Sequence, residues 1–505
     1  MSFESSFIAS KSFEGKSAVL RVDYNVPIEN GVLLDDERLL RSMPTIKYIL
    51  EQTNDLKILT HLGRPSEQNS VTEEFSLAPV AKRLGELLQK EVKLVKSIEE
   101  LKSSNSLVML ENVRAFAGEQ NNEDELSEKL GELGDIFVMD AFGTAHRKQA
   151  STYGIVNFVE EACFGLLIEQ EMKALEKIVL SPDKPLLGII GGSKISTKIN
   201  VIESLTNHCD WLIVGGALAN TCYAAQGKNI GKSLFEPSYL DVAKKIIEHP
   251  QIVIPTFVVV SNGSNVSEKS INDLSSEDVI FDVGQQSVEA FSQYIEDANT
   301  IVGNGPLGKF EDDRFSKGPE GIAKKIAEAN AMSIIGGGET LAAFSKIQMM
   351  DSVDYASTGG GAFLEYIELG SLPSLELINK NIFRLGGINK LILRNKIHST
   401  LRHDSDLKLA ICHATSSFYS DTNTTKEDSE GISNGLIFYD DIEIGIFIRE
   451  IGKDSWKVST RTNNFIDLAK FCNIFGGGGH KNAAGFSYNG KLENLIESII
   501  SNLKK

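Results

Sequence analysis

Paired cysteines, long hydrophobic runs and an excess of positive charge are all missing from this 505-residue chain. No stretch approaches the roughly 18–20 apolar residues that a membrane helix needs, and the first residues lack the basic and apolar regions of a signal peptide. We therefore expect a cytoplasmic protein with no membrane partner and with reduced, mostly buried cysteines. The cysteines lie far apart, without the spacing of a disulfide framework or a zinc site, at Cys163, Cys209, Cys222, Cys412 and Cys472.

Charge is unevenly placed along the chain. The net charge of −18 argues against nonspecific binding of nucleic acid or anionic membrane by the chain as a whole. Residues 1–375 carry −20, whereas residues 376–505 carry +2. The length predicts about two to four domains, and the charge step fits units of different origin.

Through residue 360, short apolar runs alternate with longer amphipathic stretches, which is typical of a doubly wound parallel α/β sheet. Many runs end in Gly or Asp, so functional loops should follow the carboxyl ends of the strands, where open α/β sheets bind ligands. The runs are too many for one Rossmann-like sheet, so we predict two lobes, 1–165 and 166–375, joined by a hinge helix near 165–180. The expected strands are 17–22, 57–62, 107–111, 135–140, 186–192, 211–216, 253–260, 300–304 and 333–338.

The pattern changes in the last quarter of the chain. We expect a linker over 376–404 and a small C-terminal α/β domain over 405–505, with an exposed polar loop at 420–431. Its expected elements are strands at 435–441, 442–451 and 456–462, a helix at 465–475, a glycine run and a closing helix at 492–505.

Basic side chains gather in loops and at strand ends of the first lobe, although that lobe is acidic overall. Converging guanidinium groups suit small anions, because each binds a phosphate or carboxylate bidentately. Any one of these arginines alone is better explained by a surface ion pair. The segments are RVDYNVP (21–27), DDERLL (35–40), THLGRP (60–65), ENVRAF (111–116) and DAFGTAHRKQAST (140–152).

Glycine-rich segments mark the second lobe. In GGSKISTKINVIESL (191–205), a glycine pair ends a predicted strand, and Lys194 and Lys198 are predicted on one face of the next helix. Free amides at a helix start and mobile ammonium groups suit polyphosphate. A lone triple glycine is more often a turn, but several such turns together are a stronger signal. The others are VGGALANT (214–221), GNGPLGKFED (303–312), IIGGGET (334–340) and STGGGAFLEY (357–366).

One segment imitates a phosphate-binding loop. GKNIGKS (227–233) looks like a Walker motif, but Gln226 stands where the first glycine belongs, and a helical pattern precedes it. We expect ordinary scaffold there.

In order and wording, these segments resemble those of phosphoglycerate kinases, over residues 1 to about 375. The resemblance implies that the first lobe binds 3-phosphoglycerate or 1,3-bisphosphoglycerate and the second binds ADP or ATP with Mg²⁺. Phosphoryl transfer in line would follow closure of the lobes. The substrate-side residues it implies are Asp23, Asn25, Arg38, His61, Arg64, Arg114 and Arg147.

The resemblance also distributes roles within the reaction. Arg38 and Lys194 would neutralise the transferred phosphoryl group, and Gly359, Gly360 and Gly361 would hold it on helix amides. Arg21 and His146 would be scaffold. The nucleotide residues it implies are Gly192, Lys198, Gly215, Asn304, Pro306, Glu311, Gly336, Gly337, Gly338, Glu339 and Thr340, with Glu339 helping to hold the metal.

Two positions depart from the family pattern. Gly303 stands where the family usually has Trp, and Glu339 where it usually has Asp. Because Mg²⁺ demands strict octahedral geometry, the longer Glu339 predicts weaker metal-nucleotide binding. Neither change removes a phosphate-binding charge. We expect an active kinase; the alternative is a catalytically weakened scaffold that mainly binds nucleotide or RNA.

The C-terminal segments DTNTTKEDSEGISNGLI, IREIGKDSWKVSTRT and FGGGGHKNAAGFS resemble the DHH-associated domain of bacterial nanoRNA and phosphoadenosine-phosphate phosphoesterases. The resemblance implies an anion pocket in which glycine amides join His480 and Arg461. Ser459 and Thr462 flank that arginine. The glycines are Gly476, Gly477, Gly478 and Gly479.

The catalytic half of those phosphoesterases is missing. This chain has no D-H-H triplet, and Arg402-His403-Asp404 is no substitute. We therefore expect a domain that binds nucleotide or short RNA without hydrolysing it. Two alternatives stay open: a domain that only packs or dimerises, or one completed by a separate DHH subunit. The protein would be a monomer or a weak dimer.

Overall fold

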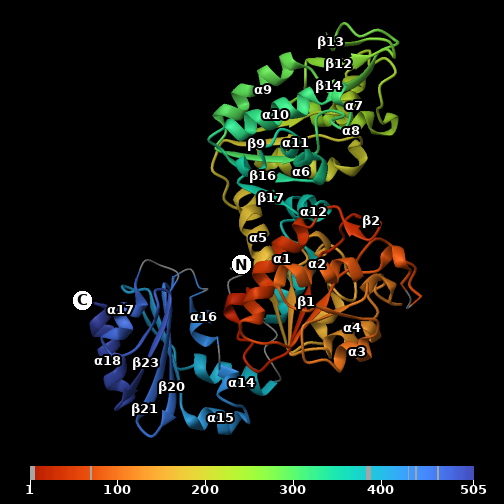
Figure 1. Ribbon diagram of the computed structural model, residues 1–505. Helices are drawn as coiled ribbons and strands as arrows, with labels where there is room; N and C mark the ends of the chain where they lie inside the picture. The colour runs from red at the N-terminus through yellow and green to blue at the C-terminus, as the bar shows by residue number, and fades with distance from the viewer. Residues whose placement is uncertain are drawn as a thin grey trace. The chain divides into compact units, whose positions relative to one another are not determined.

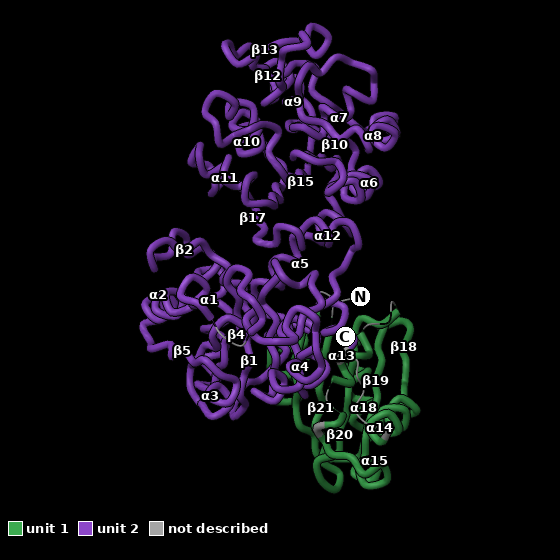
Figure 2. Tube along the Cα trace, turned by 90° about the vertical axis from the view of Figure 1, so that its right-hand side faces the viewer, with its two compact units in different colours: residues 1–5, 382–505 green, residues 6–381 purple. Residues whose placement is uncertain are grey.

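The computed structural model describes residues 6–68, 71–382, 388–429, 431–437, 439, 441–462 and 466–504. These residues form two compact units, one within 6–381 and the other within 382–505 (Figures 1 and 2). Across these ranges, no helix combines the length and the apolar character that a membrane crossing requires.

The first half of the larger unit is built on a six-stranded parallel sheet of order β5-β6-β4-β1-β7-β8. Its inner strands are buried throughout, which explains their continuous apolar runs. The strands are β1 (Ala18–Arg21), β4 (Leu56–Leu59), β5 (Lys93–Val95), β6 (Val108–Leu110), β7 (Ile136–Met139) and β8 (Glu161–Phe164). The other elements are the hairpin β2 (Ile28–Glu29)–β3 (Val32–Leu33), α1 (Glu37–Leu50), α2 (Ala78–Leu88), α3 (Ile98–Lys102) and α4 (Asp124–Gly131).

The second half repeats the plan with a parallel sheet of order β11-β10-β9-β15-β16-β17 and a small antiparallel sheet β13-β12-β14. The parallel strands are β9 (Leu186–Ile190), β10 (Trp211–Val214), β11 (Ile252–Val253), β15 (Thr300–Asn304), β16 (Met332–Gly336) and β17 (Tyr355–Ser357). The antiparallel strands are β12 (Phe257–Ser261), β13 (Val266–Ser270) and β14 (Val279–Val283). The helices are α6 (Ile199–His208), α7 (Ala217–Ala225), α8 (Leu240–Ile247), α9 (Gln285–Asp297), α10 (Lys317–Glu328), α11 (Gly338–Lys346), α12 (Gly361–Leu369) and α13 (Pro373–Ile382).

The predicted hinge helix is α5 (Leu166–Val179). Its first amides are capped from a distance, because Leu167 N and Ile168 N donate to Oδ1 of the buried Asp140 at 3.0 and 3.2 Å. Farther along, the buried Glu171 accepts from Thr358 N and from the hydroxyls of Thr358 and Ser357, each at 2.8 Å. Helix α5 is therefore tied to the loop that carries the triple glycine.

The smaller unit is built on a mixed six-stranded sheet of order β18-β19-β20-β21-β23-β22. Figure 1 shows α17 and α18 on one side of this sheet and α16 on the other. The strands are β18 (Arg402–Asp404), β19 (Leu409–Ala414), β20 (Ile444–Gly452), β21 (Ser455–Thr462), β22 (Gly478–His480) and β23 (Ala483–Asn489). The helices are α14 (Ile388–His398), α15 (Ser416–Thr422), α16 (Ile432–Leu436), α17 (Leu468–Asn473) and α18 (Leu492–Leu503).

Three predictions about elements are corrected. The expected linker 376–404 contains most of α13 together with α14 and β18, because Leu393 and Ile397 of α14 are fully buried against the smaller unit's sheet. The expected strand 435–441 begins in helix α16, whose Ile432 and Leu436 pack together into that same cluster; positions 438 and 440 lie outside the described residues. The expected strand 253–260 is broken at Pro255 and Thr256, and its second part joins the antiparallel sheet as β12.

Candidate functional site

A cavity of about 310 Å³ collects the whole predicted substrate-side set. Its walls come from the carboxyl ends of β1, β4, β6 and β7, from the start of α1 and from the turn before α12. The predicted residues on its wall are Asp23, Asn25, Arg38, His61, Arg64, Arg114, Arg147, Gly359, Gly360 and Gly361; His146, Gly63, Gly143, Thr144 and Thr358 complete it.

The carboxylate of Asp23 is paired with Arg38 in this cavity. Arg38 forms an ion pair with Asp23, and Asn25 N donates to Asp23 Oδ1 at 3.1 Å. Burial favours the neutral acid, but Arg38, this amide and Arg21 outweigh it and hold the pKa of Asp23 below its usual value. Asp23 is therefore a carboxylate that orients Arg38.

The other arginines keep their charge available. Among the described residues, Arg64, Arg114 and Arg147 have no carboxylate within ion-pair distance. Arg114 is only 5% exposed, donates from Nη1 to Gly63 O at 2.8 Å and leaves Nη2 without a described partner. Burial lowers its pKa to about 10, so it remains charged at neutral pH. A buried cation of this kind calls for an anionic ligand.

Both histidines of the cavity are neutral at physiological pH. Burial lowers the pKa of His61 well below its usual value, and the neighbouring arginines act in the same direction. Burial and Arg147 lower the pKa of His146 to about 4, and its Nε2 accepts from Arg147 Nε at 3.2 Å. The histidines therefore offer hydrogen bonds without adding charge.

Arg21 lies outside the wall, as expected of scaffold. It is fully buried, its Nε donates to Ser151 Oγ at 2.9 Å, and the same hydroxyl donates to Glu119 at 2.6 Å. Its Nη2 lies 3.3 Å from His61 Nδ1. Arg21 thus contacts His61 from the side that faces away from the cavity and helps to fix the imidazole ring.

The triple glycine forms the turn that begins α12. Gly360 adopts a φ of +50°, and a Cβ at Gly359 would lie 2.5 Å from the Phe142 ring. Gly359 N already donates to Ser357 Oγ at 3.1 Å. Because the first amides of a helix have no partner within the helix, the donors that this turn offers to the cavity are the amides of Gly360 and Gly361.

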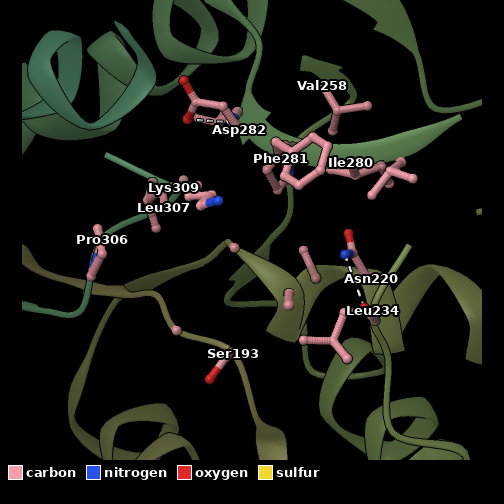
Figure 3. Close-up of a pocket in the computed structure, with 18 of the residues that line it drawn as sticks. Ser193, Asn220, Leu234, Val258, Ile280, Phe281, Asp282, Pro306, Leu307 and Lys309 are labelled. Atoms are coloured by element: carbon pink, nitrogen blue, oxygen red, sulfur yellow. Dashed lines mark hydrogen bonds between the residues drawn. The ribbon is translucent and has the colours of Figure 1, made fainter. Parts of the chain in front are cut away.

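A second cavity, of about 410 Å³, lies between α7, β14 and the loop after β15 (Figure 3). Exposed charged residues, Lys309, Glu311 and Glu339, line it together with Gly192 and Pro306. The rest of the wall is largely apolar: Tyr223, Leu234, Val258, Ile280, Phe281 and Leu307. An apolar chamber beside polar and glycine-rich loops suits a nucleoside with phosphates.

The predicted nucleotide residues divide into two groups. Gly192, Pro306, Glu311 and Glu339 line this cavity. The others lie outside its wall and include a hydrogen-bonded cluster, in which Asn304 Nδ2 donates to Gly336 O at 2.9 Å and Gly305 N donates to Thr340 Oγ1 at 2.6 Å. These others are Lys198, Gly215, Asn304, Gly336, Gly337, Gly338 and Thr340.

The two lysines do not sit on a helix face, which corrects the prediction. Lys198 is the residue before α6, and Lys194 precedes the short 3₁₀ turn Ile195–Thr197. Lys198 Nζ turns back to Gly191 O at 2.6 Å and Asn304 Oδ1 at 2.9 Å. Burial lowers its pKa to about 8, and Glu339 acts in the opposite direction. Lys194 is exposed and lies outside both walls.

The residues present fit a metal held mainly by a nucleotide. Within the described residues, no group of three or more His, Cys, Asp or Glu side chains could hold an ion. Mg²⁺ usually binds through one or two carboxylates plus substrate phosphates, and Glu339 in the first turn of α11 is the carboxylate that would supply one.

The C-terminal glycine run corrects another prediction. The amides of Gly476 and Gly477 are used within the fold, donating to Asn473 O at 3.0 Å and Cys472 O at 2.9 Å, and Gly478–His480 form the edge strand β22. An open pocket of four free glycine amides is therefore wrong.

Two predicted side chains of that domain nevertheless share a surface. Arg461 of β21 and His480 of β22 both lie opposite Ala483 of β23, the strand between them, so they project from the same face. Arg461 has no carboxylate partner among the described residues. Ser459 lies opposite Gly485, as does Gly478. This set, Arg461, His480, Ser459, Gly478 and Gly485, is called the β21–β22 face below.

The Walker-like stretch is scaffold. It follows helix α7, Asn229 Nδ2 donates to Leu274 O at 2.7 Å, and Lys232 pairs with Glu277 at the surface.

Several wall residues escaped the sequence prediction. Asn220 lies within the quoted segment 214–221, whereas Leu234, Phe281 and Asp282 come from segments without a glycine signature. No local signal distinguishes them from ordinary core residues.

The fold is that of a two-lobed α/β protein with an arginine-lined cavity in the first lobe and a largely apolar cavity beside glycine-rich loops in the second. The family model described as Phosphoglycerate kinase matches residues 8–369, and a second, described as the DHHA1 domain, matches residues 410–505. The chain belongs to the phosphoglycerate kinase family.

Solved structures agree with this assignment. The phosphoglycerate kinase from Coxiella burnetii is 42% identical, with a TM-score of 0.69, over 74% of this chain and 99% of that one. The phosphoglycerate kinase from Pyrococcus horikoshii OT3 is 29% identical, with a TM-score of 0.66, over 75% of this chain and 99% of that one.

Proposed function

We propose that the chain catalyses reversible transfer of a phosphoryl group from 1,3-bisphosphoglycerate to ADP, giving 3-phosphoglycerate and ATP. The observation that carries the proposal is the convergence of Arg38, Arg64, Arg114 and Arg147 with the Gly359–Gly361 turn around one cavity. Phosphoryl transfer needs alignment and neutralisation of charge more than covalent help from the protein.

Each part of the cavity has a task in this reaction. Arg64, Arg114 and Arg147 bind the carboxylate and phosphate of the three-carbon acid. Arg38, oriented by Asp23, neutralises the moving phosphoryl group, and the amides of the glycine turn hold its oxygens. Lys194 would join this set when the lobes close and exclude water. Mg²⁺, held by the nucleotide and Glu339, would neutralise further phosphate charge.

The test is 3-phosphoglycerate-dependent ATP consumption by the full chain across a Mg²⁺ titration. Arg38→Ala and Lys194→Ala should each lower kcat by roughly 10²–10³-fold, the loss typical of one transition-state donor. Lys232→Ala, which alters a surface ion pair in the Walker-like stretch, and Arg83→Ala, which alters exposed ion pairs, serve as controls. A folded chain without turnover at high Mg²⁺ would overturn the proposal and favour the scaffold alternative.

For the C-terminal domain we propose binding of a nucleotide or short RNA without hydrolysis. The β21–β22 face supports this proposal, because half-buried Arg461 has no acidic partner in the part of the chain that the structure describes, and glycines leave the surface around it open to a ligand backbone.

Fluorescence anisotropy with a labelled short RNA and with adenosine monophosphate tests the C-terminal proposal on the full chain. Arg461→Ala should weaken binding by roughly tenfold or more, the value of a charge-assisted hydrogen bond. Lys470→Ala, on the exposed side of α17, is the matched control. Equal binding by Arg461→Ala and the unaltered chain would refute a ligand on this face.

A further inference from the structure

The side chain of Arg41 joins a helix of the first lobe to a strand of the second. Arg41 lies in α1, and its Nη1 donates to Ala356 O of β17 at 2.5 Å. β17 is an edge strand of the second parallel sheet, so one side of its backbone is open to a side-chain donor. Arg41 therefore attaches the edge of the second sheet to the first lobe.

Glu37 sets the direction of this guanidinium group. Its Oε1 accepts from Arg41 Nε at 3.0 Å and from Arg41 Nη2 at 2.7 Å, across one turn of α1. Because Glu37 is exposed, this ion pair adds little stability by itself. Its effect is to hold the planar guanidinium fork so that Nη1 points to Ala356.

The strand end that Arg41 holds leads directly into the glycine turn. Ser357 and Thr358, which follow Ala356, donate to the buried Glu171 of α5. Burial raises the pKa of Glu171, and the hydrogen bonds from Thr358 and Ser357 and the charge of Arg41 oppose this rise. Residues 356–358 are thus held both from α1 and from α5 immediately before the turn begins.

Helix α1 also carries Arg38. Arg38 and Arg41 are three residues apart, and residues at this spacing lie on the same side of a helix. Arg38 lines the arginine-lined cavity together with Gly360 and Gly361, whereas Arg41 lies outside the walls of both cavities. One helix therefore holds Arg38 directly and, through Arg41, the strand that ends in the glycine turn.

We propose that Arg41 is a positioning residue for phosphoryl transfer: through Ala356 O it fixes the amides of the glycine turn relative to Arg38. The inference rests on the proposed function, because it takes this cavity as the place where the phosphoryl group moves. Donors aimed at developing charge act only from the correct distance, and a displacement of about 1 Å can lower the rate about 10²-fold. Substrate affinity should not depend on this spacing, since the other arginines of the cavity bind the three-carbon acid.

Steady-state kinetics of the full chain, with 3-phosphoglycerate and ATP each varied, test the proposal. Arg41→Met keeps an apolar stem but removes the donors, so it should lower kcat roughly 10–100-fold while both KM values stay within about twofold. Arg41→Lys restores a charged donor and should recover part of the lost kcat.

Arg83→Met is the matched control. Arg83 is also held by two carboxylates, but these partners, Asp36 and Glu86, belong to the first lobe. Its kcat and KM values should equal those of the unaltered chain, because no contact with the second sheet is lost.

The outcomes separate this inference from the proposed function. Absence of turnover in the unaltered chain overturns both. A folded Arg41→Met enzyme with unchanged kcat, or with its loss confined to KM, overturns the positioning role and leaves the kinase proposal standing, as does an Arg41→Lys enzyme no more active than Arg41→Met. If Arg41→Met fails to fold, Glu37→Gln decides the matter: it should lower kcat about threefold, the size expected of one exposed ion pair, and an unchanged kcat refutes the inference.

Discussion

If Lys198 contacts a nucleotide phosphate, as proposed, its half-buried ammonium group should make ADP binding sensitive to alkaline pH. Its Nζ contacts Gly191 O and Asn304 Oδ1, with Glu339 as the opposing charge, and burial lowers its pKa from 10.5 to about 8. A nucleotide phosphate beside this group favours the charged form, so the pKa should rise again in the complex.

The change of ADP affinity with pH follows from the difference between the pKa of Lys198 in the free protein and its higher pKa in the complex. Below pH 8 the free protein already carries the proton, and binding needs no proton uptake. Between pH 8 and the higher pKa of the complex, the free protein has lost a proton that the complex retains, so affinity falls as pH rises. At pH 9, one unit above the pKa, about nine-tenths of the free lysine is neutral, and Kd for ADP should be roughly tenfold higher than at pH 7.

Titration calorimetry at pH 7 and pH 9, each in two buffers of different ionisation enthalpy, measures both Kd and the protons taken up. Lys198→Met should bind ADP weakly with little change between the two pH values, whereas Lys232→Met should retain the tenfold slope of the unaltered chain. If Kd is flat from pH 7 to pH 9, or if Lys198→Met keeps the slope, the reasoning about Lys198 is wrong.

Three further predictions concern stability and metal use. Burial raises the pKa of Asp140 to about 7; because the folded acid holds its proton more tightly than the unfolded one, stability is lost as pH rises from about 4 to 7, by about 4 kcal/mol in all. Asp140→Asn, which keeps an acceptor for the α5 amides, should be more stable than the unaltered chain in urea at pH 8 and lose that advantage at pH 4. Gly303→Ala should raise the free energy of unfolding by about 1 kcal/mol, because the methyl group lowers the conformational entropy of the unfolded chain and fills part of a small apolar cavity in the folded one. The added Cβ would meet only the tip of the Ile335 side chain, at 2.9 Å. A lower urea midpoint would contradict this prediction. Glu339→Asp should reduce the Mg²⁺ concentration for half-maximal activity by roughly fivefold, the effect of about 1 kcal/mol; an unchanged Mg²⁺ requirement would show that the extra methylene is tolerated.

The sequence predicted most of the parallel strands and the set of residues that lines the arginine-rich cavity. Continuous apolar runs such as 135–140 and 186–192 formed buried strands because parallel sheets are covered on both faces. Residues that follow such strands meet at one edge, which is why arginines from distant segments share a cavity. Lys194, by contrast, was predicted with the reacting groups and lies exposed outside both cavities.

Local pattern failed where a distant contact decides the outcome. Residues 435 and 436 look strand-like, but burial of Leu436 beside Ile432 made them the end of a helix. The glycine run after α17 predicted free amides, yet the amides of Gly476 and Gly477 donate to the last carbonyls of that helix. In both cases a partner outside the local pattern sets the conformation.

By itself, the sequence determined the order of strands, helices and loops, because hydrophobic periodicity and glycine positions act over a few residues. It also determined which charges reach the edge of the first sheet. Only the tertiary structure decided that Asn220, Leu234 and Phe281 line one chamber, that Asp140 caps α5, and that Arg461 and His480 share a face. Each of these arrangements brings together residues from segments far apart in the chain. Which polar groups are buried side by side therefore depends on how those segments pack, and the local sequence pattern does not contain this information.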